Sequence, residues 1–243
     1  MKLITKIGLY NKINQLAHRA GFDIRRFPAL DQRMLLKYLR ENNISDCFDV
    51  GANTGQFAHL LRSAGFTGKI YSFEPQTKAF KTLNKNAAGN SLWSVYKIGL
   101  SDTDGIATIN ISKNSVSSSM LPISDFLEAT APETKYIASE EIKISRLDSF
   151  VKELNFNNRF FLKIDAQGFE SKILAGAENC FNNIYALQLE LSCVSLYNGE
   201  KLFDEMKAFV ESKGFYLSFL ESGFTDPKTG RLLQVDAIFL KEL

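Results

Sequence analysis

Apolar residues after position 45 fall into short runs that alternate with longer segments in which they recur every three or four positions. Short apolar runs bounded by turn residues are typical of buried strands, and the longer spacing is typical of amphipathic helices. The alternation predicts parallel β-α-β units and hence an α/β sheet. We expect strands at 47–50, 69–73, 94–99, 160–165 and 185–191, with helices at 57–63, 78–86 and 169–177.

The region closes with one helix and two strands, at 202–212, 215–220 and 235–240. Two further strands, at 106–111 and 141–145, flank a polar run at 112–119. We interpret that run either as a loop that covers a substrate or as a solvated connector, because small polar residues suit both. There is no internal repeat, so residues 45–243 are predicted to form one domain.

Residues 1–44 follow a different pattern and are predicted to be a helical extension. A first helix has one apolar face, formed by Leu3, Ile7, Tyr10, Ile13, Ala17 and Ala20. Gly21 follows where a C-terminal cap would lie. A second helix is expected at 31–42. The first helix either packs on the main domain, as most amphipathic helices do, or lies on an anionic membrane.

Positive charge is concentrated in this extension. Residues 1–40 contain nine Lys or Arg and two acids, a net charge of +7, which leaves −5 on the rest of a chain whose total is +2. Such an asymmetry is typical of an arm that meets an anionic surface. Peripheral contact with the inner face of a membrane is therefore a hypothesis for this segment.

The composition is that of an ordinary globular domain, since 45% of the 243 residues are hydrophobic and 23% are charged. No apolar stretch approaches the ~18 residues of a membrane span, and the N-terminus lacks a signal-peptide pattern. The three cysteines, Cys47, Cys180 and Cys193, are too far apart for a zinc site or a disulfide framework. We therefore expect a cytoplasmic protein, and the sequence leaves its oligomeric state open.

A glycine-containing loop joins the first strand of the domain to its first helix, and it reads Asp49-Val50-Gly51-Ala52-Asn53-Thr54-Gly55. Gly51 permits a tight turn, and Gly55 lets the helix begin close to a ligand whose anionic part its free N–H groups attract. Asp49 would face a cationic group, such as the amino group of a methionine moiety. The spacing D-x-G-x-x-x-G departs from the G-x-G-x-x-G of dinucleotide sites, which argues against an NAD-dependent dehydrogenase.

A second acid, Glu74, ends the next strand and is followed by Pro75. In this topology such an acid accepts hydrogen bonds from both ribose hydroxyls of a nucleoside. Ser101 and Asp102 follow the third strand, where an adenine edge would lie, although this polar run also suits a plain turn. Loop and acid together predict S-adenosylmethionine as cofactor, bound by Asp49, Gly51, Ala52, Asn53, Gly55, Glu74, Pro75, Ser101 and Asp102.

These motifs resemble the FkbM-type S-adenosylmethionine-dependent methyltransferase family over about residues 46–241. The resemblance rests on the loop at 49–55, on Ser72-Phe73-Glu74-Pro75 and on Lys163-Ile164-Asp165-Ala166-Gln167-Gly168-Phe169-Glu170. It implies a Rossmann-like class I methyltransferase sheet, mostly parallel with an antiparallel last strand. It also implies O-methylation, often of sugars in secreted glycans or natural products. The family usually has Glu where this chain has Gln167, which places a catalytic or metal role at that position in doubt.

Methyl transfer chiefly requires the acceptor oxygen to be held in line with the methyl group. Asp165 ends the fourth core strand and is the candidate for orienting or deprotonating the acceptor. An ordinary Asp is a weak base, so burial or a metal would have to assist it. A buried Lys163 is expected to pair with an acid such as Glu190, in a catalytic or a purely structural role. Asp165, Glu190 and Asp236 are candidate oxygen ligands for Mg²⁺.

The leading hypothesis is thus an O-methyltransferase that acts on a hydroxyl of a sugar or glycoconjugate. The alternative is a catalytically inactive Rossmann-like binding module in glycan assembly, which would keep the loop but tolerate loss of Asp165. A nucleic-acid partner is disfavoured because the sheet domain is net acidic and lacks the Asp/Asn-Pro-Pro-Tyr signature of base-flipping methyltransferases.

Overall fold

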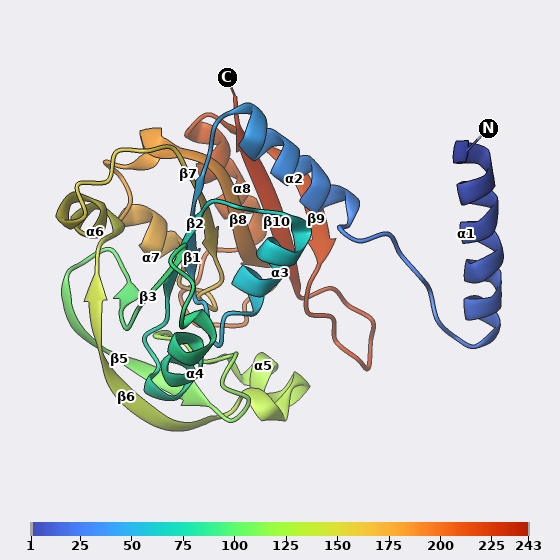
Figure 1. Ribbon diagram of the computed structural model, residues 1–243. Coiled ribbons are helices and arrows are strands. Elements are labelled where there is room, and N and C mark those ends of the chain that lie inside the picture. The colour runs from blue at the N-terminus through green and yellow to red at the C-terminus, as the bar shows by residue number, and fades with distance from the viewer. Residues whose placement is uncertain (1, 243) are drawn as a thin grey trace.

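A seven-stranded sheet forms the centre of the molecule (Figure 1). The computed structural model describes residues 2–242, with side chains from Tyr10 onward. The strands follow the order β3-β2-β1-β7-β8-β10-β9. They are β1 Asp46–Val50, β2 Lys69–Phe73, β3 Trp93–Tyr96, β7 Phe160–Ile164, β8 Ile184–Ser192, β9 Phe215–Ser222 and β10 Gln234–Lys241. β10 pairs antiparallel with both neighbours and the other pairs are parallel, which confirms the predicted fold class.

Helices cover both faces of this sheet because alternate residues of each buried strand point to opposite sides. Cys47 and Phe161 face one layer of helices, and Phe48 and Leu162 face the other. The first layer consists of α2 Leu30–Glu41, α3 Gln56–Ala64 and α4 Thr77–Ala87. The second consists of α6 Leu147–Glu153, α7 Glu170–Ala175 and α8 Phe203–Ser212.

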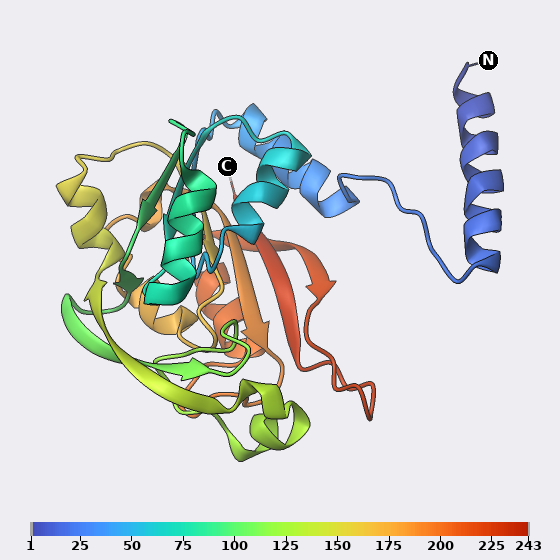
Figure 2. The same cartoon turned by 60° about the horizontal axis from the view of Figure 1, so that its bottom comes forward.

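A second, three-stranded sheet lies below the central one in Figure 2. It consists of β4 Gly99–Leu100, β6 Tyr136–Ser145 and β5 Gly105–Ser112, in the order β4-β6-β5. The strands predicted at 106–111 and 141–145 are confirmed as its antiparallel pair. The strand predicted at 94–99 is wrong in its second half, because β3 ends at Tyr96 and Gly99 pairs with Ile144 of β6. The chain changes sheets between Tyr96 and Gly99, and apolar residues occur on both sides of this break, so the pattern did not reveal it.

The sequence analysis did not predict several short helices and turns. They are α5 Asp125–Thr130, α6, and the 3₁₀ turns Pro132–Thr134 and Phe181–Asn183. Helices of six or seven residues make fewer than two full turns, so hydrophobic periodicity is a weak signal for them, and of the three such helices only α7 was predicted.

The first helix, α1 Lys2–Arg19, stands apart from the sheet domain in both views (Figures 1 and 2). On its expected apolar face Tyr10 and Ile13 are exposed, and the side chains of Leu3 and Ile7 lie outside the described ones. The interpretation that this helix packs on the main domain is therefore wrong. α2, in contrast, is part of the domain's core, and the division at residue 44 stays a prediction. Within residues 2–242, no helix has the length and apolar character needed to cross a membrane.

Two glycines of the loop after β1 are required by close packing. A Cβ on Gly51 would lie 1.8 Å from the backbone oxygen of Asp165, so the loop rests directly on the end of β7. A Cβ on Gly55 would lie 2.7 Å from the ring of Trp93. Gly55 therefore accommodates Trp93, and the expectation that it serves the approach of a ligand is not supported.

Gly55 and Gly65 offer a matched test of this packing. Both have left-handed backbones, with φ values of 95° and 108°, and a Cβ on Gly65 would meet nothing within 4 Å. Alanine at either position strains the backbone by about 1–2 kcal/mol. We expect Gly55→Ala to lower the free energy of unfolding by about 1–3 kcal/mol more than Gly65→Ala, because the new methyl group overpacks Trp93. Equal losses in chemical denaturation would contradict the Trp93 contact.

Candidate active site

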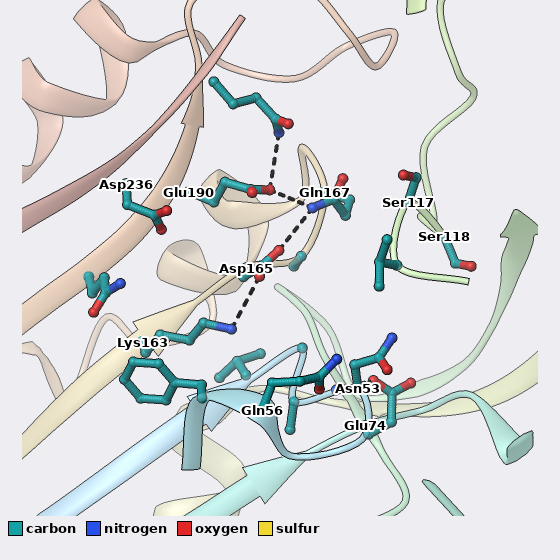
Figure 3. Close-up of a pocket in the computed structure, with 18 of the residues that line it drawn as sticks. Asn53, Gln56, Glu74, Ser117, Ser118, Lys163, Asp165, Gln167, Glu190 and Asp236 are labelled. Atoms are coloured by element: carbon teal, nitrogen blue, oxygen red, sulfur yellow. Dashed lines mark hydrogen bonds and ion pairs between the residues drawn. The ribbon is translucent and has the colours of Figure 1, made fainter. Parts of the chain in front are cut away.

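A cavity of about 600 Å³ opens at the carboxyl ends of the parallel strands (Figure 3). Ligands of open α/β sheets bind at this edge, and the volume lies within the usual range of small-molecule sites. Its walls come from the loops after β1, β2 and β7, from β8 and β10, from α2 and α3, and from residues 116–120. The last segment belongs to the polar run at 112–119, so that run forms a wall of the cavity and is not merely a solvated connector.

Five of the predicted cofactor residues line this cavity: Gly51, Ala52, Asn53, Glu74 and Pro75. Glu74 is almost completely buried, with 2% of its surface exposed. One of its carboxylate oxygens accepts from the backbone N–H of Asn53 at 2.8 Å, and the other accepts from that of Gln76 at 2.8 Å. Burial raises the pKa of Glu74 to about 7.

Asp49 does not reach the cavity, so it is not placed to face a ligand's amino group. Its side chain is fully buried beneath the loop. One carboxylate oxygen accepts from the hydroxyl of Ser72 at 3.0 Å, and the other lies 3.5 Å from Nζ of Lys163. The cation that Asp49 faces is therefore a residue of the protein.

Gly55, Ser101 and Asp102 also lie outside the residues that line the cavity. Asp102 forms an ion pair with Lys172 at 3.0 Å and borders a separate, smaller pocket. The adenine-binding role predicted for Asp102 thus receives no support from its position. The residues just before it, Ile98–Leu100, line the cavity instead.

The predicted catalytic residues are joined in one hydrogen-bonded chain (Figure 3). Lys163 Nζ lies 3.3 Å from Oδ2 of Asp165, and Gln167 Nε2 donates to Oδ1 of Asp165 at 2.9 Å. The same Gln167 nitrogen donates to Glu190, which also accepts from Gln234 at 3.1 Å. Lys163 is thus paired with acids, as expected, but these are Asp165 and Asp49, and Glu190 is connected to it only through Gln167 and Asp165.

The charges of this chain are set by burial and by one another. Burial opposes the positive charge of Lys163, but Asp165 and Asp49 outweigh it and raise the pKa of its ammonium group. Burial, followed by repulsion from Asp165 and Asp236, raises the pKa of Glu190 well above its ordinary value. Lys163 is thus held charged, while Glu190 binds a proton more readily than a free glutamate.

Gln167 lies at the centre of this hydrogen-bonded chain. The sequence analysis did not predict that central position. The backbone of Gln167 is left-handed, with a φ of 54°, and its side-chain oxygen accepts from the hydroxyl of Tyr197 at 2.7 Å. Its backbone oxygen accepts from the hydroxyl of Ser119 at 2.7 Å. Gln167 thereby ties the end of β7 to the polar run and to Tyr197. The departure from the family pattern was the one sequence signal for it, and nothing local marked Tyr197.

Four carboxylates form a row across the sheet at this edge. Asp165 directly follows β7, Glu190 is paired in register with Asp236, and Asp236 is paired with Glu221. Over residues 2–242, no group of three or more His, Cys, Asp or Glu side chains is arranged to hold a metal ion. The amide of Gln167 lies between Asp165 and Glu190 and presents N–H donors to both, so these two carboxylates face a donor group. The predicted Mg²⁺ ligands are therefore not assembled as a site.

The sheet topology and the cavity at the strand ends define a Rossmann-like α/β fold with a small-molecule site. Residues 49–217 match the family described as the methyltransferase FkbM domain, and this is more than half of the chain. The chain therefore belongs to the FkbM methyltransferase family, as the resemblance predicted. A comparison with curated proteins gave no match.

Similar solved structures are methyltransferases of several kinds. An rRNA methylase from Streptococcus thermophilus has 14% identity and a TM-score of 0.49, with 91% of this chain and 100% of that chain covered. TrmK from M. capricolum, in complex with S-adenosyl-homocysteine, has 14% identity and a TM-score of 0.47, with 89% and 70% covered. Magnesium protoporphyrin IX methyltransferase from Synechocystis, with bound SAM, has 9% identity and a TM-score of 0.44, with 87% and 78% covered. Likeness at this level concerns the general fold and says nothing of the substrate.

The residues of the cavity fit the cofactor of this family. Glu74 offers a buried carboxylate beside the glycine loop, where ribose hydroxyls would need acceptors. Phe73, Ile98 and Leu100 add apolar wall to the same part of the cavity, which suits a purine ring.

Gln167→Glu tests the importance of a neutral amide between two acids. The new carboxyl group would lie beside Asp165 and Glu190, so its folded-state pKa would be raised above its unfolded value. The resulting loss of stability is small while the group is protonated and grows as the pH rises through the unfolded pKa towards the folded one. We expect the loss in free energy of unfolding to be at least about 1.4 kcal/mol larger at pH 8 than at pH 4, which corresponds to one pKa unit. Gln15→Glu on the exposed face of α1 is the control, and a similar pH dependence in both variants would contradict the network.

Proposed function

We propose that the protein transfers a methyl group from S-adenosylmethionine to a hydroxyl of a sugar or glycoconjugate. The observation that carries this proposal is the lining of the cavity beyond the cofactor loop. Most of that lining is apolar, and its polar side chains are chiefly carboxylates and amides, among them Asp31, Gln56, Asp165, Gln167, Gln188, Glu190, Glu221, Gln234 and Asp236. Within the described wall, Lys163 is the one Lys or Arg side chain, and two acids already engage it.

Such a lining favours an uncharged acceptor with several hydroxyl groups. Carboxylates accept hydrogen bonds from hydroxyls, and amides both donate and accept. A phosphorylated or carboxylated acceptor would instead require free cations, and arginine in particular. The net negative lining would repel such an acceptor, so a neutral sugar is the substrate class that fits best.

Within this proposal, Glu74 binds the ribose hydroxyls, and the backbone from Gly51 to Asn53 supports the rest of the cofactor. When bound, S-adenosylmethionine supplies a methyl group activated by a positively charged sulfur. Asp165 would accept a hydrogen bond from the acceptor hydroxyl and take up its proton. Lys163 and Gln167 orient the Asp165 carboxylate by holding one oxygen each.

We also propose a cytoplasmic location. The cysteines Cys47, Cys180 and Cys193 are free thiols, and Cys47 and Cys180 are buried. Unpaired thiols are typical of reducing compartments.

Glu74→Gln tests the cofactor site. The pKa of Glu74 is raised to about 7 by burial, so the group gains its charge as the pH rises through 7. A charged carboxylate is the stronger acceptor for ribose hydroxyls, and we expect the affinity for S-adenosylhomocysteine to increase from about pH 6 to about pH 8. Glu74→Gln should lose this dependence and bind at least about tenfold more weakly at pH 8, as expected for a hydrogen bond to a charged group. Calorimetry at both pH values, with Glu153→Gln as control, checks this, and unchanged binding by Glu74→Gln would remove it from the site.

Asp165→Asn tests the transfer step. We expect it to bind S-adenosylhomocysteine as the wild type does but to lower turnover at least about tenfold, which is the usual contribution of a general base. Turnover is measured as incorporation of a labelled methyl group into a panel of neutral and phosphorylated glycosides, with the exposed Asp204→Asn as control. Preference for a phosphorylated acceptor would contradict the proposed substrate class. A wild type that binds the cofactor and methylates no glycoside would favour the alternative of an inactive binding module.

A further inference from the structure

The chain before α2 has a defined shape, which we call the N-terminal hook (residues 10–27). The helix α1 ends at Arg19, Gly21 turns the chain, and the following residues run back along the helix. The hydroxyl of Tyr10 donates to the backbone oxygen of Ile24 at 2.7 Å, and the N–H of Ile24 donates to the side chain of Asn14 at 2.8 Å. In Figures 1 and 2, α1 stands apart from the sheet domain, and the second arm of the hook joins it to α2.

The hook exposes large apolar side chains that the fold does not cover. Leu16 is 63% exposed and Phe22, at the turn, is 70% exposed. Six such side chains lie in the hook: Tyr10, Ile13, Leu16, Phe22, Ile24 and Phe27. Scattered single apolar residues are normal on a protein surface, but a concentration of them marks an interaction site.

The charge of the hook identifies the kind of surface that these side chains suit. The hook carries the basic residues Lys12, Arg19, Arg25 and Arg26 and a single acid, Asp23. Arg25 and His18 engage that acid, at 2.8 and 3.2 Å, and with Arg25 as the main cause the pKa of Asp23 falls to about 2. Basic charge interleaved with exposed apolar side chains is the combination that binds the interface of an anionic bilayer.

The remainder of the chain has the opposite charge. Residues 41–243 carry a net charge of −5, whereas residues 1–40 carry +7. An anionic surface would therefore attract the hook and repel the domain. The hook leads directly into α2, whose Asp31, Gln32 and Leu35 line the cavity, so a hook at a membrane would keep the cavity close to that membrane.

We propose that the N-terminal hook docks on an anionic phospholipid bilayer, with its apolar side chains in the interface and its basic side chains against the lipid phosphates. The docking is independent of the proposed methylation. If both hold, a glycolipid at the membrane surface is within reach of the cavity as an acceptor.

The test uses the full chain and sedimentation with two kinds of vesicle. Wild-type protein should bind vesicles of phosphatidylglycerol and phosphatidylcholine, bind pure phosphatidylcholine vesicles at least about tenfold more weakly, and lose most binding at high salt. Lys12→Glu with Arg26→Glu should weaken binding to the anionic vesicles at least about tenfold, and Leu16→Ser with Phe22→Ser should weaken it similarly. Lys12 and Arg26 make no ion pair or side-chain hydrogen bond among the described contacts, so the charge reversal leaves the hook's own bonds in place.

Matched controls separate the hook from the rest of the surface. Lys143→Glu with Lys152→Glu changes exposed charges on β6 and α6, and Ile106→Ser with Ile137→Ser changes exposed apolar residues on β5 and β6; both pairs should bind as the wild type does.

Equal binding of the wild type to both vesicle types, or full binding by either hook variant, overturns the proposal. A dimer in light scattering that dissociates with Leu16→Ser and Phe22→Ser, without vesicle binding, would assign the surface to a second copy of the chain. All variants should keep S-adenosylhomocysteine binding, so a failed docking test remains distinct from a failed enzymatic assignment.

Discussion

A buried lysine connects the two strands on which the site is built. Lys163 is nearly inaccessible, and its ammonium group lies between Asp49 of β1 and Asp165 at the end of β7. Removing one partner of a buried ion pair leaves an uncompensated charge and typically destabilises a protein by about 3–5 kcal/mol. The ion pairs that hold β1 beside β7 are therefore the same ones that orient the Asp165 carboxylate, so stability and chemistry share these residues.

The backbone couples the same two strands a second time. The contact of Gly51 with the backbone oxygen of Asp165 leaves no space for a side chain. A shift of the cofactor loop must therefore move the end of β7, and a shift of Asp165 must move the loop. Methyl transfer depends on alignment between donor and acceptor, and this close packing keeps the residues proposed for each in a constant relation.

The row of carboxylates would repel itself if every member were charged and unpartnered, since like charges on neighbouring strands are destabilising. Two side chains reduce this repulsion between carboxylates. Lys163 lies at one end of the row, and the amide of Gln167 lies between Asp165 and Glu190. Gln167 is left-handed and is held by Tyr197 and Ser119, so the amide is positioned by three separate parts of the chain. Gln167, at which the sequence departs from the usual family residue, thus positions the side chains of this network.

The sequence by itself determined the order of most strands and helices, the loop at 49–55, and the positions of Glu74 and Asp165 at strand ends. These features depend on local patterns of apolar residues and turns, which a linear chain displays directly. The tertiary structure alone decided that Asp49 faces Lys163, that Gln167 meets Tyr197, that Asp102 lies outside the cavity, and that α1 leaves the domain. The reason is that side-chain partners depend on strand register and on contacts between residues far apart in the chain, and neither is encoded in the spacing of any single segment.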